Sequence, residues 1–224
     1  MVVAVDGYSS TGKSTVAKLV AKELGLVYID TGAMYRAVTY FSLKSNLFNG
    51  NDVDVNRLEE LLPTVKINFV PNANSGKNDT YLNGVCVESE IRGMEVSNRV
   101  STIAAIGFVR EFLVAQQQEM GRRGNVIMDG RDIGTVVFPN ADIKFFMTAS
   151  PQVRAQRRYE ELVAKGDNVT YEEVEKNVIT RDYMDSHRSV SPLVQAPDAV
   201  VIDNGGMTIE ENVATMVNAI KAKM

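Results

Sequence analysis

The amino-acid sequence predicts an α/β protein with a five-stranded parallel sheet. Five short apolar runs, rich in β-branched residues, are typical of buried strands; they cover residues 2–6, 26–30, 125–129, 143–147 and 199–203. Helical segments separate the runs, which favours parallel pairing because parallel strands need long crossover connections. With 224 residues and 45% hydrophobic content, the chain can form one three-layer α/β domain plus a small insertion. We therefore expect a single domain over residues 1–224.

The first strand runs directly into a glycine-rich loop. Residues 7–14, Gly-Tyr-Ser-Ser-Thr-Gly-Lys-Ser, fit the pattern G-x-x-x-x-G-K-[ST] at every fixed position, and residues 15–24 follow with the apolar spacing of a helix. In such a P-loop the backbone N–H groups and the helix N-terminus surround a polyphosphate, Lys13 reaches the β- and γ-phosphates, and Ser14 can ligate Mg²⁺. The motif predicts a nucleoside triphosphate site. The residues expected to bind ATP are Gly7, Tyr8, Ser9, Ser10, Thr11, Gly12, Lys13, Ser14 and Thr15.

Two further strands end in polar residues that belong at the same sheet edge. The second strand ends at Asp30, and Thr31–Arg36 opens a helix there, so Arg36 could reach a phosphate. The strand at 125–129 ends in Asp129, which has the position of an acid that holds hydrated Mg²⁺. The following loop, residues 130–134, adds an arginine and a second acid. We expect Ser14 and Asp129 to hold the metal.

An antiparallel insertion is predicted at residues 63–92, where the apolar pattern changes to a period of two. Val65, Ile67 and Phe69 alternate with polar residues, a loose segment covers 71–79, and Asn83-Gly84 favours a tight primed turn. The pattern indicates three short strands beside the main sheet. The next segment, 95–123, has the pattern of one helix.

Residues 151–188 are expected to form a mobile helical lid. Arg154, Arg157 and Arg158 share one face of the first helix, far in sequence from any run of acids that could pair with them. Residues 166–168 break this helix, and a second helix covers 171–188. Such arginines suit a lid that closes over phosphates. A last amphipathic helix, 208–223, is expected to pack on the sheet.

The overall charge argues against nucleic acid as the main partner. The chain has a net charge of -4, and its sequence pI is about 5.2. Nine arginines nevertheless fall between positions 110 and 188, which a small anionic ligand would explain. Cys86 is the only cysteine, so an intrachain disulfide is impossible, and we expect it to be a small buried strand residue. The sequence shows no charged leader and no apolar run that could span a bilayer. We therefore predict a cytoplasmic monomer without a membrane partner.

The residues available for catalysis limit the kinds of phosphoryl acceptor that the chain could use. His187 is the only histidine, and nothing resembles the catalytic aspartate motif of protein kinases, so a hydroxyl acceptor that needs deprotonation is poorly served. An acceptor that is already an anion needs no base. Transfer of a γ-phosphoryl group to a phosphate monoester requires alignment, Mg²⁺ and charge neutralisation. A nucleoside monophosphate kinase fits best.

Four motifs together resemble bacterial cytidylate kinases. They lie at residues 7–15, at 30–36 (Asp-Thr-Gly-Ala-Met-Tyr-Arg), at 129–139 (Asp-Gly-Arg-Asp-Ile-Gly-Thr-Val-Val-Phe-Pro) and at 181–188 (Arg-Asp-Tyr-Met-Asp-Ser-His-Arg), and the resemblance covers essentially the whole chain. The first motif is generic, whereas the third and fourth together are specific. The family also has a short antiparallel insertion that corresponds to residues 63–92.

The resemblance implies phosphoryl transfer from ATP to CMP or dCMP, in pyrimidine metabolism. In the family, residues at the positions of Ser101, Arg110 and Asp132 read the base, which suits cytosine because its N4 amino group donates while N3 and O2 accept. Arginines at the positions of Arg36, Arg131 and Arg188 hold the substrate phosphate in the family. Residues at the positions of Arg181 and Asp185 contact the sugar. Thr31 stands where the motif usually has serine, which keeps the hydroxyl. The residues expected to bind CMP are Thr31, Arg36, Ser101, Arg110, Arg131, Asp132, Arg181, Asp185 and Arg188, and those expected to act in catalysis are Lys13, Arg131, Arg157, Arg158 and Arg188.

Two other functions stay open at this point. The same scaffold could phosphorylate another small phosphate or hydroxyl acceptor, and thermal stabilisation by CMP alone among monophosphates would separate the two enzymes. Outside enzymes, the chain could be a nucleotide-dependent switch. A GTPase switch is disfavoured because the sequence has no Asn-Lys-x-Asp motif for reading guanine.

Overall fold

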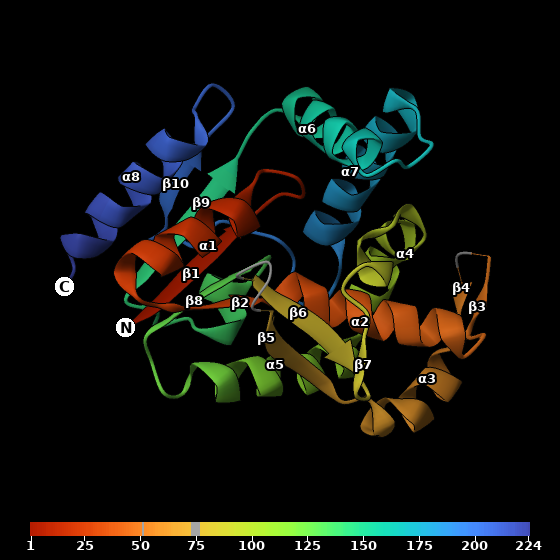
Figure 1. Cartoon of the computed structure of the whole chain (residues 1–224). Helices are drawn as coiled ribbons and strands as arrows, with labels where there is room; N and C mark the ends of the chain where they lie inside the picture. The colour runs from red at the N-terminus through yellow and green to blue at the C-terminus, as the bar shows by residue number, and fades with distance from the viewer. Residues whose placement is uncertain (51, 73–76) are drawn as a thin grey trace. The chain divides into compact units, whose positions relative to one another are not determined.

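Five parallel strands form the sheet that the sequence predicts, in the order β10-β9-β1-β8-β2 (Figure 1). Their bounds are β1 Val2–Gly7, β2 Val27–Asp30, β8 Val126–Gly130, β9 Ile143–Thr148 and β10 Val200–Asp203. The fold is seen in a computed structural model that describes residues 1–50, 52–72 and 77–224. The first strand lies at the centre because it pairs with β8 on one side and with β9 on the other. The P-loop therefore begins in the middle of the sheet.

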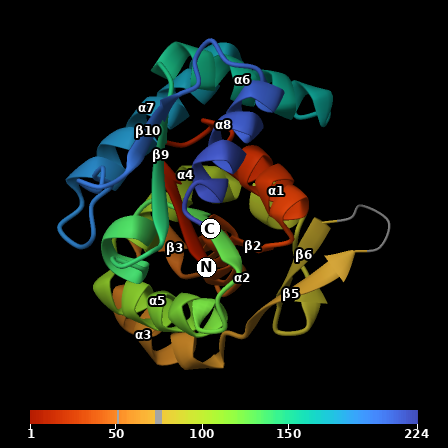
Figure 2. The same ribbon diagram turned by 90° about the vertical axis from the view of Figure 1, so that its left-hand side faces the viewer.

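The chain divides into two units, one made of residues 1–30 and 116–224 and the other of residues 31–115. The first unit contains the sheet and the helices α1 (Lys13–Leu24), α6 (Pro151–Ala164), α7 (Tyr171–His187) and α8 (Ile209–Lys221). Helices α1 and α8 lie side by side on the sheet, as both views show (Figure 1, Figure 2). Their apolar side chains, among them Val16, Val20 and Met216, pack against Val3 and Val5 of β1 in one core.

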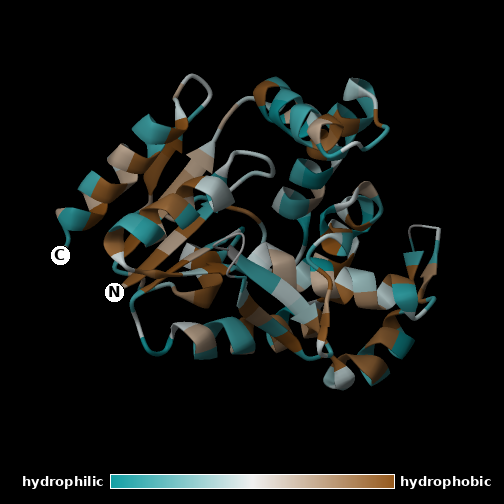
Figure 3. Cartoon of the chain, viewed as in Figure 1, coloured by the Kyte–Doolittle hydropathy of each residue, from teal (hydrophilic) through white to brown (hydrophobic). Residues whose placement is uncertain are grey.

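Local sequence signals explain where these helices begin and end. Gly25 ends α1 in the left-handed conformation, with φ of 69°. Ser150 caps α6 ahead of a proline, and Thr170 and Thr208 begin α7 and α8 with capping boxes. Figure 3 shows the strands of the sheet mostly in hydrophobic colours and α6 and α7 largely in hydrophilic ones. Among the described residues, no helix has both the length and the apolarity that a bilayer crossing requires.

The second unit contains the antiparallel insertion. Strands β5 (Ile67–Asn72), β6 (Lys77–Leu82) and β7 (Val85–Cys86) form a three-stranded sheet, which confirms the prediction. Asn83 and Gly84 both have positive φ, 49° and 83°, as a primed turn requires. The strands extend into the segment predicted to be loose; of that segment, 73–76 lie outside the described residues. Cys86 is exposed, so the prediction of a buried cysteine was wrong: β7 is a two-residue edge strand with both side chains exposed.

The remaining elements of this unit are mostly helical. They include α2 (Thr31–Lys44), the two-residue strands β3 (Phe48–Asn49) and β4 (Asp52–Val53), α3 (Val55–Leu61), α4 (Met94–Ala104) and the first part of α5 (Gly107–Gly121). The prediction of one helix over 95–123 was wrong, because the chain breaks between α4 and α5. The N–H group of Ile106 bonds to the carbonyl oxygen of Ile103, a tight turn that ends α4, and Gly107 starts the next helix.

Candidate active site

The P-loop has a backbone conformation that depends on glycine. Gly7 has a φ of 144°, and a Cβ atom there would lie 2.0 Å from the carbonyl oxygen of Met147 in β9. Gly12 has a φ of 87°, and α1 begins at the next residue, Lys13. The positive end of the α1 dipole thus lies at the end of the loop, where an anion is favoured. The predicted order of strand, loop and helix is confirmed.

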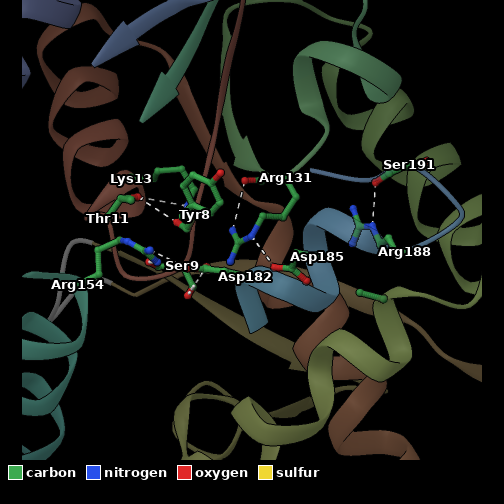
Figure 4. Close-up of polar contacts among 12 residues, drawn as sticks. Tyr8, Ser9, Thr11, Lys13, Arg131, Arg154, Asp182, Asp185, Arg188 and Ser191 are labelled. Carbon is green, nitrogen blue, oxygen red and sulfur yellow. Dashed lines mark hydrogen bonds and ion pairs between the residues drawn. The ribbon is translucent and has the colours of Figure 1, made fainter. Parts of the chain in front are cut away.

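Lys13 is buried beside the loop backbone (Figure 4). Its Nζ donates to the carbonyl oxygen of Tyr8 at 2.6 Å and to Oγ1 of Thr11 at 3.5 Å. Burial, assisted by the charge of Arg131, lowers the pKa of Lys13 to about 7, although Asp129 and Asp6 act in the opposite direction. A triphosphate next to this amine would favour its charged form. Lys13 is therefore placed to respond strongly to phosphate charge.

Ser14 and Asp129, the two residues expected to hold a metal, meet at the start of α1. Ser14 Oγ donates to Oδ2 of Asp129 at 2.7 Å, and the hydroxyl of Tyr28 donates to Oδ1 at 2.6 Å. Burial, followed by the charge of Asp30, raises the pKa of the Asp129 carboxyl. A hard cation bound largely by phosphates and water needs only one or two protein oxygens of this kind, so the pair fits Mg²⁺. The sequence analysis missed Tyr28, because its partner lies 101 residues away in sequence.

Three arginines surround the buried carboxyl group of Asp185. Arg131 Nε bonds to Asp185 Oδ2 at 2.9 Å (Figure 4). Burial alone would favour the neutral acid, yet Arg131, Arg181 and Arg188 together hold the pKa of Asp185 below its ordinary value. Burial and the charge of Arg131 lower the pKa of Arg181 to about 10. The structure thus brings together four of the predicted CMP-binding residues, with excess positive charge that an anion would balance. Asp132, next to Arg131, is also buried.

Arg154 has acidic and backbone partners, contrary to the expectation of an unpaired lid arginine. It is almost fully buried, and its Nη2 forms an ion pair with Oδ2 of Asp182 in α7 at 2.6 Å. Its Nε donates to the carbonyl oxygen of Ala149 at 2.8 Å, and its Nη1 to that of Ser9 at 3.1 Å. The guanidinium also lies 5.1 Å from the ring centre of Tyr8. Arg154 therefore joins the predicted lid to the P-loop.

The other two lid arginines also have partners. Arg157 donates to the side-chain oxygen of Asn204 at 3.1 Å and to its backbone oxygen at 2.8 Å. Asn204 in turn donates to the carbonyl oxygen of Thr11 in the P-loop at 2.5 Å. Arg158 pairs with Glu161 one turn along the same helix, at 2.8 Å. The expectation that no acids pair with the lid arginines was wrong for two of them, because helix spacing gives Arg158 its partner Glu161 and the return of α7 gives Arg154 its partner Asp182.

The remaining predicted residues belong to the second unit. Thr31 begins α2 and is buried, as is Ser101 on α4. Arg36, on α2, donates to the carbonyl oxygen of Ile91 at 3.5 Å. Arg110 is buried on α5, where Nη1 donates to the carbonyl oxygen of Ala104 at 2.9 Å and the guanidinium lies 5.2 Å from the ring centre of Tyr35. Tyr35, missed in the sequence, is a further neighbour of a predicted base-reading residue.

A sequence model of the cytidylate kinase family matches residues 3–222. The chain belongs to the cytidylate kinase family. A cytidylate kinase of Parabacteroides distasonis is 58% identical, with 96% of this chain and 93% of the relative covered. Those of Bacteroides thetaiotaomicron and Flavobacterium johnsoniae are both 54% identical; the matches cover 93% and 97% of this chain, and 91% and 95% of the relatives.

Solved structures support the fold. An uncharacterized protein from Eubacterium ventriosum superposes with a TM-score of 0.51 at 11% identity, covering 99% of this chain and 98% of the other. At that identity the likeness concerns the fold alone. Family membership confirms the resemblance based on four motifs, and the parallel sheet with its antiparallel insertion confirms the predicted fold class. The roles assigned to individual site residues stay predictions.

Proposed function

We propose that this chain transfers the γ-phosphoryl group of ATP to CMP or dCMP, giving ADP and CDP or dCDP. The observation that carries the proposal is the match of the cytidylate kinase family to nearly the whole chain, residues 3–222. A nucleoside monophosphate kinase of this kind acts in pyrimidine nucleotide metabolism. We further propose that the chain acts as a cytoplasmic monomer and a single kinase domain, without nucleic acid or a membrane as partner.

On the donor side, the proposal assigns the triphosphate to the P-loop. The backbone N–H groups of Gly7–Thr15 would hold the β- and γ-phosphates, and Lys13 would follow the negative charge as it moves in the transition state. Ser14 and Asp129 would hold Mg²⁺, and the metal would neutralise phosphate charge when bound. The 2.7 Å contact between Ser14 and Asp129 supports this assignment.

On the acceptor side, the proposal divides CMP among three groups of residues. Ser101, Arg110 and Asp132 would read the cytosine edge. Arg36, Arg131 and Arg188 would hold the monophosphate. Arg181 and Asp185 would contact the sugar. Thr31, outside these three groups, would contribute its hydroxyl to CMP binding. The buried arginines around Asp185 support an anionic ligand in the first unit.

The chemistry requires alignment and charge neutralisation, and it does not require a general base. The acceptor oxygen of a monophosphate is already anionic, so no proton has to be removed. His187, the single histidine, lies exposed at the end of α7 with its ring stacked 4.2 Å from Tyr183. Arg131, Arg157, Arg158 and Arg188, together with Lys13, are the groups proposed to stabilise charge on the transferring phosphoryl group.

We propose that residues 151–188 act as a lid whose first turn stays attached to the P-loop. Arg154 supports this form of the lid, because it is buried against Ser9 and Asp182. Movement would then concern the outer turns of α6 and α7, and Arg157 and Arg158 would exchange Asn204 and Glu161 for phosphate oxygens.

A coupled assay tests the proposed function. The purified chain receives ATP and Mg²⁺ with CMP, dCMP, UMP, AMP or GMP in turn, and ADP formation is followed together with the nucleoside diphosphate formed. We expect CMP and dCMP to give the highest kcat/KM. A higher kcat/KM for another monophosphate, or for a small hydroxyl compound, would assign the chain to a different kinase activity. Nucleotide binding without any turnover would favour a switch.

A further inference from the structure

Asp6 is a buried carboxylate that the proposed reaction does not use. It is the second-to-last residue of β1, directly before the P-loop glycine Gly7, and is only 4% exposed. Its Oδ1 accepts from the N–H group of Ile133 at 2.8 Å, and its Oδ2 accepts from the N–H group of Gly134 at 2.7 Å. Both donors lie in the turn that follows Asp132. One carboxylate therefore holds two consecutive peptide units of that turn.

The backbone of Asp132 is fixed by the same turn. A single π-helical turn, Ile133–Val137, begins directly after it, and the Asp132 carbonyl oxygen accepts from the N–H groups of Val136 at 2.8 Å and Val137 at 3.2 Å. The Asp132 side chain is 3% exposed. The peptide units on the C-terminal side of Asp132 are thus held twice, by bonds to the Asp132 carbonyl oxygen and by bonds to the Asp6 carboxylate.

The packing around Gly134 leaves this turn little freedom to move. A Cβ atom at Gly134 would lie 3.0 Å from Cδ of Lys144 and 3.3 Å from Oδ2 of Asp6. Lys144 is itself fixed, because its Nζ donates to the carbonyl oxygen of Pro139 at 2.6 Å and pairs with Asp198 at 2.9 Å. The turn is therefore seated between a buried acid and a buried lysine side chain, and a methyl group at Gly134 would crowd both of them, so that the turn or a neighbour has to shift slightly.

We propose that Asp6 is a positioning residue for base selection, which orients Asp132 through the two N–H groups that follow it. The proposal rests on the proposed CMP kinase activity and on the expected contact of Asp132 with the cytosine amino group. A carboxylate discriminates between cytosine and uracil only if its oxygen points at the exocyclic position, where cytosine donates and uracil accepts. Asp6 contributes to that choice without touching the base.

Asp6→Asn is the main test, because it changes one oxygen to an amide nitrogen of similar size. Asparagine can accept from one of the two N–H groups but presents a donor to the other, so the turn must shift. We expect the ratio of kcat/KM for CMP to that for UMP to fall about tenfold, within the range for a lost base contact. The KM for CMP should rise. Loss of the Asp6 charge also acts on Lys13, but that effect is common to both acceptors, so the CMP/UMP ratio is the deciding readout.

Asp132→Asn and the double variant separate positioning from general damage. If Asp6 acts through Asp132, the two single variants lower the CMP/UMP ratio, and the double variant lowers it no further than Asp132→Asn does alone. Gly134→Ala displaces the same turn without altering the carboxylate, so it should lower the ratio too; it provides the test if Asp6→Asn does not fold.

The possible outcomes distinguish this inference from the proposed function. If the unmodified chain does not phosphorylate CMP, both fail. If it does but Asp132→Asn keeps the ratio, the base contact is misassigned and the positioning role falls with it. If Asp132→Asn lowers the ratio while Asp6→Asn and Gly134→Ala leave it unchanged, base selection stands and the role of Asp6 is overturned. A ratio lowered additively in the double variant would also overturn it.

Discussion

Replacing Arg154 by alanine should destabilise the chain strongly, although the sequence indicated a lid arginine that closes over phosphates. The substitution removes an ion pair with Asp182 at 2.6 Å and two hydrogen bonds to carbonyl oxygens, at a site where the Arg154 side chain is 3% exposed and that of Asp182 is 15% exposed. Removing one partner of a buried ion pair costs about 3–5 kcal/mol. Because Asp182 keeps some contact with water, we expect a loss near the lower limit, about 3 kcal/mol in the free energy of unfolding.

Urea unfolding followed by circular dichroism measures this loss, and a matched pair on the surface provides the control. Arg122 pairs with Glu119, but the two side chains are 77% and 64% exposed, so Arg122→Ala should cost less than about 1 kcal/mol. Asp182→Asn keeps an acceptor for Arg154 and should cost less than Arg154→Ala does. The double variant should show a coupling of about 1–3 kcal/mol between the two positions.

The same variant has a functional readout at the P-loop. Arg154 holds the carbonyl oxygen of Ser9 and covers the ring of Tyr8, so its loss should raise the KM for ATP more than the KM for CMP. The reasoning is refuted if Arg154→Ala is no more destabilising than Arg122→Ala. It is also refuted if the variant is stable and lowers only kcat, because Arg154 would then serve the transferring phosphate and not the loop.

Four other changes have expected outcomes. Lys13→Ala should lower kcat at least about a hundredfold and leave the Kd for CMP within a few-fold, since its interaction grows as charge moves; a normal kcat would contradict the assignment. Gly7→Ala should unfold or severely destabilise the chain because its Cβ would meet a β9 carbonyl oxygen at 2.0 Å, whereas Gly107→Ala has open space and should be near neutral in thermal melts. Burial raises the pKa of Asp6 from 3.8 to about 6. As the pH rises, the unfolded chain therefore loses this proton before the folded chain does, and the free energy of unfolding falls between about pH 4 and pH 6. The unfolding free energy of the unmodified chain minus that of Asp6→Asn should therefore drop by up to about 3 kcal/mol over this range, and a constant difference would disprove the linkage. Hydrogen exchange in residues 151–188 should slow with CMP plus an ATP analogue and little with CMP alone; equal protection without ligand would indicate a rigid element.

The features predicted from sequence were those with a local signal. The signals for strand β1 and the P-loop lie in consecutive residues of the sequence. For β8, the observed bounds, Val126–Gly130, differ by one residue from the predicted bounds, 125–129. The break between α4 and α5 was missed because the tight turn at Ile106 contains no proline, and a single glycine, Gly107, is its only sequence signal. The buried position expected for Cys86 was wrong because composition does not reveal that a strand is short and at an edge.

The structure brings together some residues that the motifs assign to the site, whereas their roles stay predictions. Ser14 and Asp129 were placed together because each ends a recognisable segment, and the structure joins them at 2.7 Å. Tyr28 was missed because tyrosine in a strand is ordinary, and only the fold shows that its hydroxyl holds the same carboxylate.

The role of Asp6 was missed and that of Arg154 was misassigned for a common physical reason. Both charged residues hold backbone groups beside the P-loop or the turn after β8: Asp6 accepts from two N–H groups, and Arg154, besides its ion pair with Asp182, donates to two carbonyl oxygens. A loop buried beside a ligand site has backbone groups that no helix or strand satisfies, and each needs a partner, because an unpaired buried polar group is costly. Charge alone therefore does not tell a substrate-binding residue from one that supports a loop. The position of the residue in the fold is more informative. Asp6 and Arg154 both lie where a strand or helix meets a loop, and a buried charged residue at such a junction more directly indicates support of the loop backbone than contact with phosphate.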